Sequence, residues 1–114
     1  MKLPEEGMLL RVFIGEQDKI NSKPLYEQIV MKARELNMAG ATVLQGILGF
    51  GADSRIHSAK ILRLSEDLPI VVEIVDTEEK INTILPFLEE TVQEGMITLE
   101  KVKVLKYTKK KKKK

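Results

Sequence analysis

The chain has 114 residues, 43% hydrophobic and 32% charged, a composition typical of one globular domain with a core of its own. It contains no cysteine and one histidine, His57, which excludes disulfides, thiolate chemistry and a multi-histidine metal site within one chain. No Gly-x-Ser-x-Gly elbow presents a nucleophile to His57, so we expect no enzyme. No apolar run approaches the roughly 18 residues of a membrane span, and residues 1–7 lack the apolar core of a signal peptide; we therefore expect a cytoplasmic protein without membrane insertion.

The net charge of +2 conceals an uneven distribution. Residues 109–114 are six consecutive lysines, so residues 1–108 hold thirteen basic against seventeen acidic residues. Because a run of like charges repels itself, we expect one domain over residues 1–108 and a disordered poly-lysine tail over residues 109–114. Such a tail is either an arm for nucleic acid or an anionic membrane, or only a solubilising end. The acidic body favours the solubilising end and no nucleic-acid partner.

The first half of the chain predicts a strand, a helix and a second strand. Residues 8–14 (MLLRVFI) form a short apolar run of strand type. A helix is predicted from Pro24, which is tolerated in the first turn, to about residue 38, with one apolar face spaced by three and four residues. Residues 41–48 (ATVLQGIL) then predict a strand in which Gly46 marks a bulge.

The second half repeats this order after a long polar connection. Residues 49–68 contain at most a weak strand at 61–64, and residues 68–75 (LPIVVEIV) predict the clearest strand. Asp76 is the expected N-cap of a second helix, in which Pro86 should produce a kink or a break. Gly95 should end this helix, and residues 96–107 alternate as a last strand.

Two βαβ halves of this length predict a ferredoxin-like α+β fold, βαββαβ, with an antiparallel four-stranded sheet and two helices on one face. The other face of such a sheet must be solvated or covered by another subunit. Apolar residues occur at nearly every position of 69–75, so both faces of this strand should be buried. The sequence therefore predicts an oligomer.

Three glycines lie at Gly46, Gly49 and Gly51 in the run GILGFGADSRIH. Glycines after a strand can let backbone amides surround an anion, or can simply serve bulge and turn geometry. The spacing Gly-x-x-Gly-x-Gly is neither the dinucleotide pattern nor a Walker A loop. Taken alone, the motif favours turn geometry.

The order and spacing of several motifs resemble the PII signal-transduction proteins. These motifs are Gly40-Ala-Thr-Val43, Gly49-Phe-Gly51, Leu68-Pro-Ile-Val-Val-Glu-Ile-Val75 and Gly95. Further motifs resemble a small PII-like family of uncharacterised proteins that carries a domain-of-unknown-function label: Pro24-Leu-Tyr-Glu27, Ala39-Gly-Ala-Thr42, Gly46-Ile-x-Gly-Phe-Gly51, Ile56-His57 and Asp67-Leu-Pro69.

The PII resemblance implies a homotrimer that binds adenine nucleotides between subunits and signals through a long loop, here residues 52–67, to a transporter, channel or enzyme. Gly49, Phe50 and Gly51 match the entry to that loop, and Gly95 matches a phosphate-holding loop. The chain departs from PII at Ala52-Asp53, where Arg-Gln is usual, and has no tyrosine between residues 52 and 68. An adenylate with less charge, or another small anion, therefore stays open as the effector.

Further candidates lie in and beside the loop. Arg55 offers a planar fork for a phosphate or carboxylate, and Lys60 and Arg63 could complete a basic mouth. His57 is either a ligand-binding or metal-ligating residue or a loop histidine bonded to the backbone. The alternative function is a metal-binding trimer of the CutA type, in which His57 is joined by the carboxylates that follow the first strand, Glu16 and Asp18.

Overall fold

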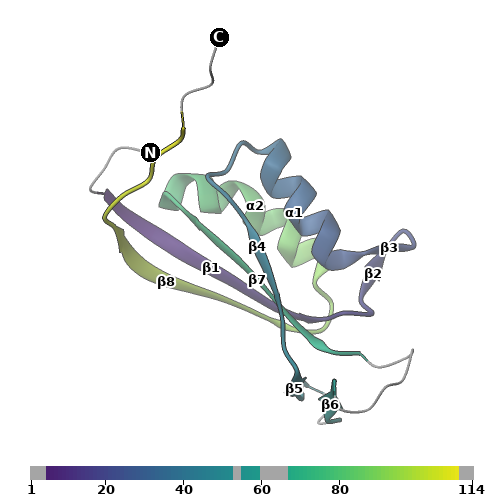
Figure 1. The fold of residues 1–114 in the computed structure, drawn as a ribbon. Helices are drawn as coiled ribbons and strands as arrows, with labels where there is room; N and C mark the ends of the chain where they lie inside the picture. Colours follow the sequence, from purple (N-terminus) through teal and green to yellow (C-terminus); the bar gives the residue numbers. More distant parts are fainter. Residues whose placement is uncertain (1–4, 53–54, 60–66, 111–114) are drawn as a thin grey trace.

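The computed structural model, which describes residues 5–52, 55–59 and 67–110, contains a four-stranded antiparallel sheet with both helices on one face (Figure 1). The strand order is β4-β7-β1-β8, and two small two-stranded ribbons, β2–β3 and β5–β6, lie beside it. The predicted ferredoxin-like α+β fold is confirmed. The main elements are β1 (Glu5–Gly15), α1 (Leu25–Glu35), β4 (Thr42–Gln45), β7 (Pro69–Asp76), α2 (Glu78–Thr91) and β8 (Met96–Val104); the ribbons are β2 (Lys19–Ile20) with β3 (Lys23–Pro24), and β5 (Leu48–Gly49) with β6 (His57–Ser58).

The core fills the space between the sheet and the two helices. Alternate residues of β1 and β7 point toward the helices, because side chains of a strand alternate between its two faces. Each helix packs against them with residues three or four positions apart, which lie on one helical face. The buried apolar residues are Leu10, Val12, Ile14, Leu25, Ile29, Ala33, Ile70, Val72, Ile74, Ile81, Ile84 and Leu88. The fold thus follows directly from the hydrophobic pattern of the sequence.

The opposite face of the sheet, called the open face below, is not fully buried in the single chain. Its residues on β7 are only half-buried, whereas their neighbours facing the helices are buried. The expectation that both faces of this strand are buried therefore fails for the chain alone. Strand register places Phe13 between Val71 and Met96, and Leu44 beside Val71. An apolar row, with Phe13, Leu44 and Met96 exposed, consequently crosses all four strands.

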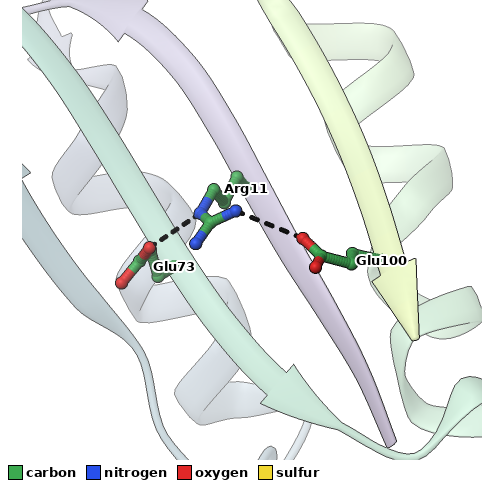
Figure 2. A network of polar contacts seen from close by, with 3 residues as sticks. All are labelled: Arg11, Glu73 and Glu100. Atoms are coloured by element: carbon green, nitrogen blue, oxygen red, sulfur yellow. Dashed lines mark hydrogen bonds and ion pairs between the residues drawn. The ribbon is translucent and has the colours of Figure 1, made fainter. Parts of the chain in front are cut away.

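A polar row lies next to this apolar row on the open face. Arg11 donates from Nε to Glu73 at 2.8 Å, and its second nitrogen lies 3.5 Å from a carboxylate oxygen of Glu100, so the guanidinium bridges β7 and β8 (Figure 2). Donation to the Glu73 carboxylate raises the pKa of Arg11. The guanidinium therefore stays charged throughout the physiological pH range.

The start of α2 differs from the prediction by one residue. Thr77, not Asp76, is the N-cap, and its side chain accepts a hydrogen bond from the Lys80 backbone N–H at 3.2 Å. Asp76 is buried instead, and its carboxylate accepts hydrogen bonds from the N–H groups of Thr77 and Ala39, both at 2.7 Å. A buried carboxylate needs such donors, so Asp76 ties the α1–β4 connection to the end of β7.

Pro86 lies inside α2 without splitting it. Proline removes one backbone donor, which leaves the carbonyl of Asn82 without its usual partner. Both residues are exposed, so water can take the place of the missing donor. The α1 helix, β4 and β8 end three residues earlier than the expected boundaries at 38, 48 and 107, and the weak strand at 61–64 lies outside the described residues.

Candidate functional site

A cavity of about 570 Å³ lies where the open face meets the β5–β6 ribbon and the turn before β8. The elements around it are the end of β1, the starts of β7 and β8, the residues that follow β5, and β6. Its lining combines apolar side chains with glycine backbone and a few ionisable groups: Phe13, Ile14, Gly15, Asp18, Phe50, Gly51, Ala52, His57, Asp67, Pro69, Ile70, Val71, Glu94, Gly95 and Met96. Volumes of roughly 300–1,000 Å³ are typical of small-molecule sites.

The β5–β6 ribbon forms one wall of the cavity. Gly49 pairs with His57 across the ribbon, and the Ala59 N–H donates to the carbonyl of Ile47 at 2.8 Å. Gly46 follows β4 rather than interrupting it, and its N–H donates to the carbonyl of Pro69 at 2.7 Å. A Cβ atom at Gly49 would lie 2.9 Å from Cγ of Pro69, so this close packing of ribbon on β7 requires glycine.

Gly95 forms another wall and has a backbone that other residues rarely adopt. Its φ is +151°, and a Cβ atom there would lie 2.3 Å from the carbonyl oxygen of Phe13. Only glycine accepts both this conformation and this approach. The residue brings the turn before β8 against β1 and so closes the cavity on that side.

Asp67 anchors the far end of the loop segment to the end of β1. Its Oδ1 accepts a hydrogen bond from the Gln17 N–H at 2.7 Å, and the carbonyl of Leu68 accepts one from the Glu16 N–H at 2.9 Å. Asp18 is also engaged, because its Oδ2 accepts from the Gly15 N–H at 3.1 Å. These bonds hold two carboxylates at fixed positions in the wall.

The ionisable groups of the cavity are predominantly acidic. Three carboxylates, those of Asp18, Asp67 and Glu94, share the lining with the imidazole of His57. Within the described part of the chain, no lysine or arginine contributes to this lining. A highly charged polyphosphate would therefore meet net repulsion unless cations came from elsewhere.

The structure brings together most of the site residues expected from the sequence. Phe50, Gly51, His57 and Gly95 line the cavity, and Gly49 supports its wall. Arg55 is exposed and lies outside the lining. Lys60 and Arg63 fall outside the described residues, so the proposed basic mouth stays a prediction.

Several lining residues were not foreseen from the sequence. Phe13 and Met96 read as ordinary strand residues, yet they pair in register and form the apolar floor with Val71. Asp67 was seen only as part of a family motif. The sequence did contain a hint of this floor. Apolar residues occur on the face of the sheet that has no helix to pack against, so they must contact something else.

The described residues contain no group of three His, Asp or Glu side chains arranged to hold a metal ion. Glu16 instead accepts a hydrogen bond from the side chain of Gln45 and does not line the cavity. The CutA-type alternative consequently finds no metal centre in this part of a single chain. Nor does any helix among the described residues have the length and apolarity to cross a membrane.

A family model matches residues 7–104, which is nearly the whole of the described fold. The model is DUF190, whose description is "Uncharacterized ACR, COG1993". The chain belongs to the DUF190 family. The small family of uncharacterised proteins that the sequence motifs suggested is thereby confirmed.

This DUF190 chain is also similar to individual proteins in sequence and, separately, in fold. Two UPF0166 proteins of Aquifex aeolicus (strain VF5) are 42% identical over 99 residues and 37% identical over 97, each covering 85% of this chain and 91% and 95% of the relative. The fold is similar to that of CPII, a nitrogen regulatory PII-like protein from Thiomonas intermedia K12 bound to ADP, AMP and bicarbonate. The TM-score is 0.64 with 18% identity, over 90% of this chain and 91% of CPII. This DUF190 chain therefore has a PII-like fold.

Proposed function

We propose that the protein is a PII-like sensor that binds a small effector, an adenine nucleotide of low charge or another small anion, in the cavity beside the β5–β6 ribbon. It acts as a regulator rather than an enzyme, and residues 52–67 pass the signal to a transporter, channel or enzyme. The observation that carries this proposal is the lining itself. Residues at both described ends of the segment, Ala52 and Asp67, lie in the cavity wall.

The chemistry of the wall supports an aromatic base as one part of the ligand. Phe13, Phe50 and Met96 offer an apolar surface of the kind on which planar rings pack. Backbone of Gly51 and Gly95 lies beside them, where a small anionic group can approach closely. CPII, with the same fold, is described as bound to ADP, AMP and bicarbonate, which is compatible with ligands of this kind.

The open face supports assembly into a homotrimer with the cavity at a subunit boundary. The apolar row leaves Phe13 38%, Leu44 48% and Met96 60% exposed in the single chain, and burying such a row is favourable. Three of its members, Phe13, Val71 and Met96, also line the cavity. A second copy on the open face would thus cover the apolar row and contribute to the same site.

Ligand binding can change the conformation of residues 52–67, because both Ala52 and Asp67 line the cavity. A ligand that contacts both ends favours one arrangement of residues 52–67 over others, because it binds that arrangement more tightly. A free-energy difference of roughly 1–3 kcal/mol is sufficient for a biological switch. The acidic wall adds a preference: AMP should bind more tightly than ATP.

Thermal unfolding of the full chain with AMP, ADP, ATP and bicarbonate tests the proposal. A ligand at about 100 times its dissociation constant adds roughly 2.7 kcal/mol of stability, which should raise Tm by roughly 10 °C. We expect this shift with AMP or ADP and a smaller one with ATP. No shift with any of the four compounds would contradict the sensor.

Two substitutions, one on either side of β5, locate the site. Phe50→Ser should abolish the AMP-dependent shift, because Phe50 lines the cavity. Ile47→Ser is the control, since Ile47 is equally exposed but lies outside the lining and contributes only its backbone carbonyl to the ribbon. Equal loss in both variants would place the ligand elsewhere.

A further inference from the structure

A second cavity, called the distal cavity below, lies at the other end of β7 from the β5–β6 ribbon. It has a volume of about 420 Å³, and its walls are the α1–β4 connection (37–39), the end of β7, the start of α2 and Tyr107. The β7 strand runs from Pro69 in the wall of the first cavity to Asp76 in the wall of the distal one. Its seven residue steps at about 3.3 Å separate these residues by roughly 23 Å. The two cavities are therefore separate sites.

The distal cavity lies on the helix-facing side of the sheet. Asp76 follows the alternation of Ile70, Val72 and Ile74, whose side chains are buried against the helices. A homotrimer built on the open face would consequently not cover this cavity. A volume of this size is typical of a small-molecule site.

Asp76 is the buried member of the lining, with 5% of its surface exposed. The N–H groups of Thr77 and Ala39 donate to its two oxygens at 2.7 Å, which uses two of the roughly four acceptor positions of a carboxylate. Within the described residues, no lysine, arginine or histidine forms an ion pair with Asp76. Because buried charges are usually paired, this carboxylate favours a cationic group in the cavity.

Two further charged side chains, Glu79 and Lys80, line the same cavity from the first turn of α2. Nζ of Lys80 donates to the carbonyl of Leu36 at 3.1 Å, which uses one of the three N–H donors of an ammonium group. Glu79 is exposed, and in the described part of the chain neither Glu79 nor Asp76 forms an ion pair with Lys80. The wall thus offers two carboxylates and one ammonium group to the charges of a ligand.

We propose that the distal cavity binds a basic α-amino acid, which carries two cationic groups and one carboxylate. The α-ammonium group meets Asp76, the carboxylate meets Lys80, and the side-chain cation meets Glu79 at the exposed rim. A neutral amino acid leaves Glu79 without a partner, and a simple diamine leaves Lys80 beside like charge. The hydroxyl groups of Thr77 and Thr83 lie in the same lining and supply further hydrogen-bonding capacity.

Isothermal titration calorimetry of the full chain with three related compounds tests this inference. L-lysine should bind saturably, with one molecule per chain. L-norleucine, which lacks the side-chain ammonium group, should bind about fivefold more weakly, since one exposed ion pair is lost. Cadaverine, which lacks the carboxylate, should also bind about fivefold more weakly, because Lys80 loses its partner.

Two neighbouring carboxylates of α2 provide a matched pair of variants. Glu79→Gln should weaken L-lysine binding about fivefold and remove the preference for L-lysine over L-norleucine. The control is Glu78→Gln, a change at an exposed residue of the same turn that lies outside the lining, and it should alter the affinity less than twofold. Both side chains are exposed, so neither change should prevent folding.

A further control identifies the occupied cavity, because the cavity beside the β5–β6 ribbon is also acidic. Phe50→Ser alters that first cavity and should leave the affinity for L-lysine within twofold. The inference is overturned if L-lysine does not bind, if L-norleucine binds equally well, if Glu78→Gln matters as much as Glu79→Gln, or if Phe50→Ser abolishes binding. None of these results depends on whether the first cavity binds a nucleotide.

Discussion

Two glycines of the cavity wall differ in how strictly the structure requires them. At Gly95 a Cβ atom would overlap the carbonyl oxygen of Phe13, and the positive φ adds backbone strain. At Gly51 a Cβ atom would meet no described heavy atom within 4 Å. The first glycine is therefore needed for folding, whereas the second is tolerant of a methyl group.

Replacing Gly95 with alanine should lower the free energy of unfolding by roughly 2–4 kcal/mol, since β1 and the turn before β8 must move apart. Gly51→Ala should change it by less than about 0.5 kcal/mol. Urea unfolding of both variants measures the difference. Equal stability of the two would show that the turn before β8 relaxes without cost.

Individual contacts were predictable from the sequence only where a local pattern encodes them. Gly95 could be assigned through its resemblance to a loop glycine, and His57 by being the single histidine. The hydrogen bond from the Gln17 N–H to Asp67 joins residues fifty positions apart, and no local sequence pattern predicts it. A site built from long-range contacts cannot be predicted from local sequence, because it depends on which strands pair and in which register.

Two residues just before helix α2, Asp76 and Thr77, accept hydrogen bonds from backbone N–H groups at its start. Thr77 bonds the Lys80 N–H, while Asp76 bonds the Thr77 N–H and reaches across to Ala39. Thr83, six residues after Thr77, donates to the carbonyl of Lys80 and caps nothing. The same residue type thus has two different roles in one helix.

Thr77→Ala should lower the free energy of unfolding by about 1 kcal/mol, because a backbone donor loses its capping partner. Thr83→Ala should be neutral or slightly stabilising, since alanine has the higher helix propensity and the bond lost is local. Denaturant unfolding compares them. Equal destabilisation would mean that Thr77 acts through packing rather than through its cap.

At the level of elements, strands and helices were predicted well because each leaves a hydrophobic pattern in the sequence, either a short apolar run or a helical spacing of three and four residues. The nearly continuous apolar run over residues 69–75 identifies β7, and the spacing of Ile81, Ile84 and Leu88 identifies one face of α2. The start of α2 was placed one residue too early, because Asp76 and Thr77 are both common N-cap residues and stand side by side. Of the two outcomes expected at Pro86, a kink or a break, the break does not occur, because α2 continues from Glu78 to Thr91.

The whole molecule presents one face that the chain does not cover. Its apolar row crosses all four strands next to the charged row of Arg11 and its two carboxylates. Order, topology and a need for a partner surface could be foreseen from the sequence. The cavity could not, because it exists only where paired strands and the ribbon converge.

Phe13→Glu should dissociate the proposed homotrimer, since each copy would bury an unpaired carboxylate in the interface on the open face. Light scattering after size exclusion should give about three times 12.9 kDa for the parent chain and one chain mass for the variant. Met31→Glu, which places the same charge at an exposed apolar residue of α1, is the control and should leave the mass unchanged. A monomeric parent chain would contradict the proposed assembly.

The position of β1 at the centre of the sheet has a consequence for biosynthesis. This strand is made first, but one of its two neighbours, β8, is made last. During synthesis β1 must therefore wait with an unpaired edge that can bind other extended chains. Pairings between such distant segments also form slowly. We expect newly made chains to be most prone to aggregation just before residues 96–104 emerge, and chaperones that shield exposed strands to matter most at that moment.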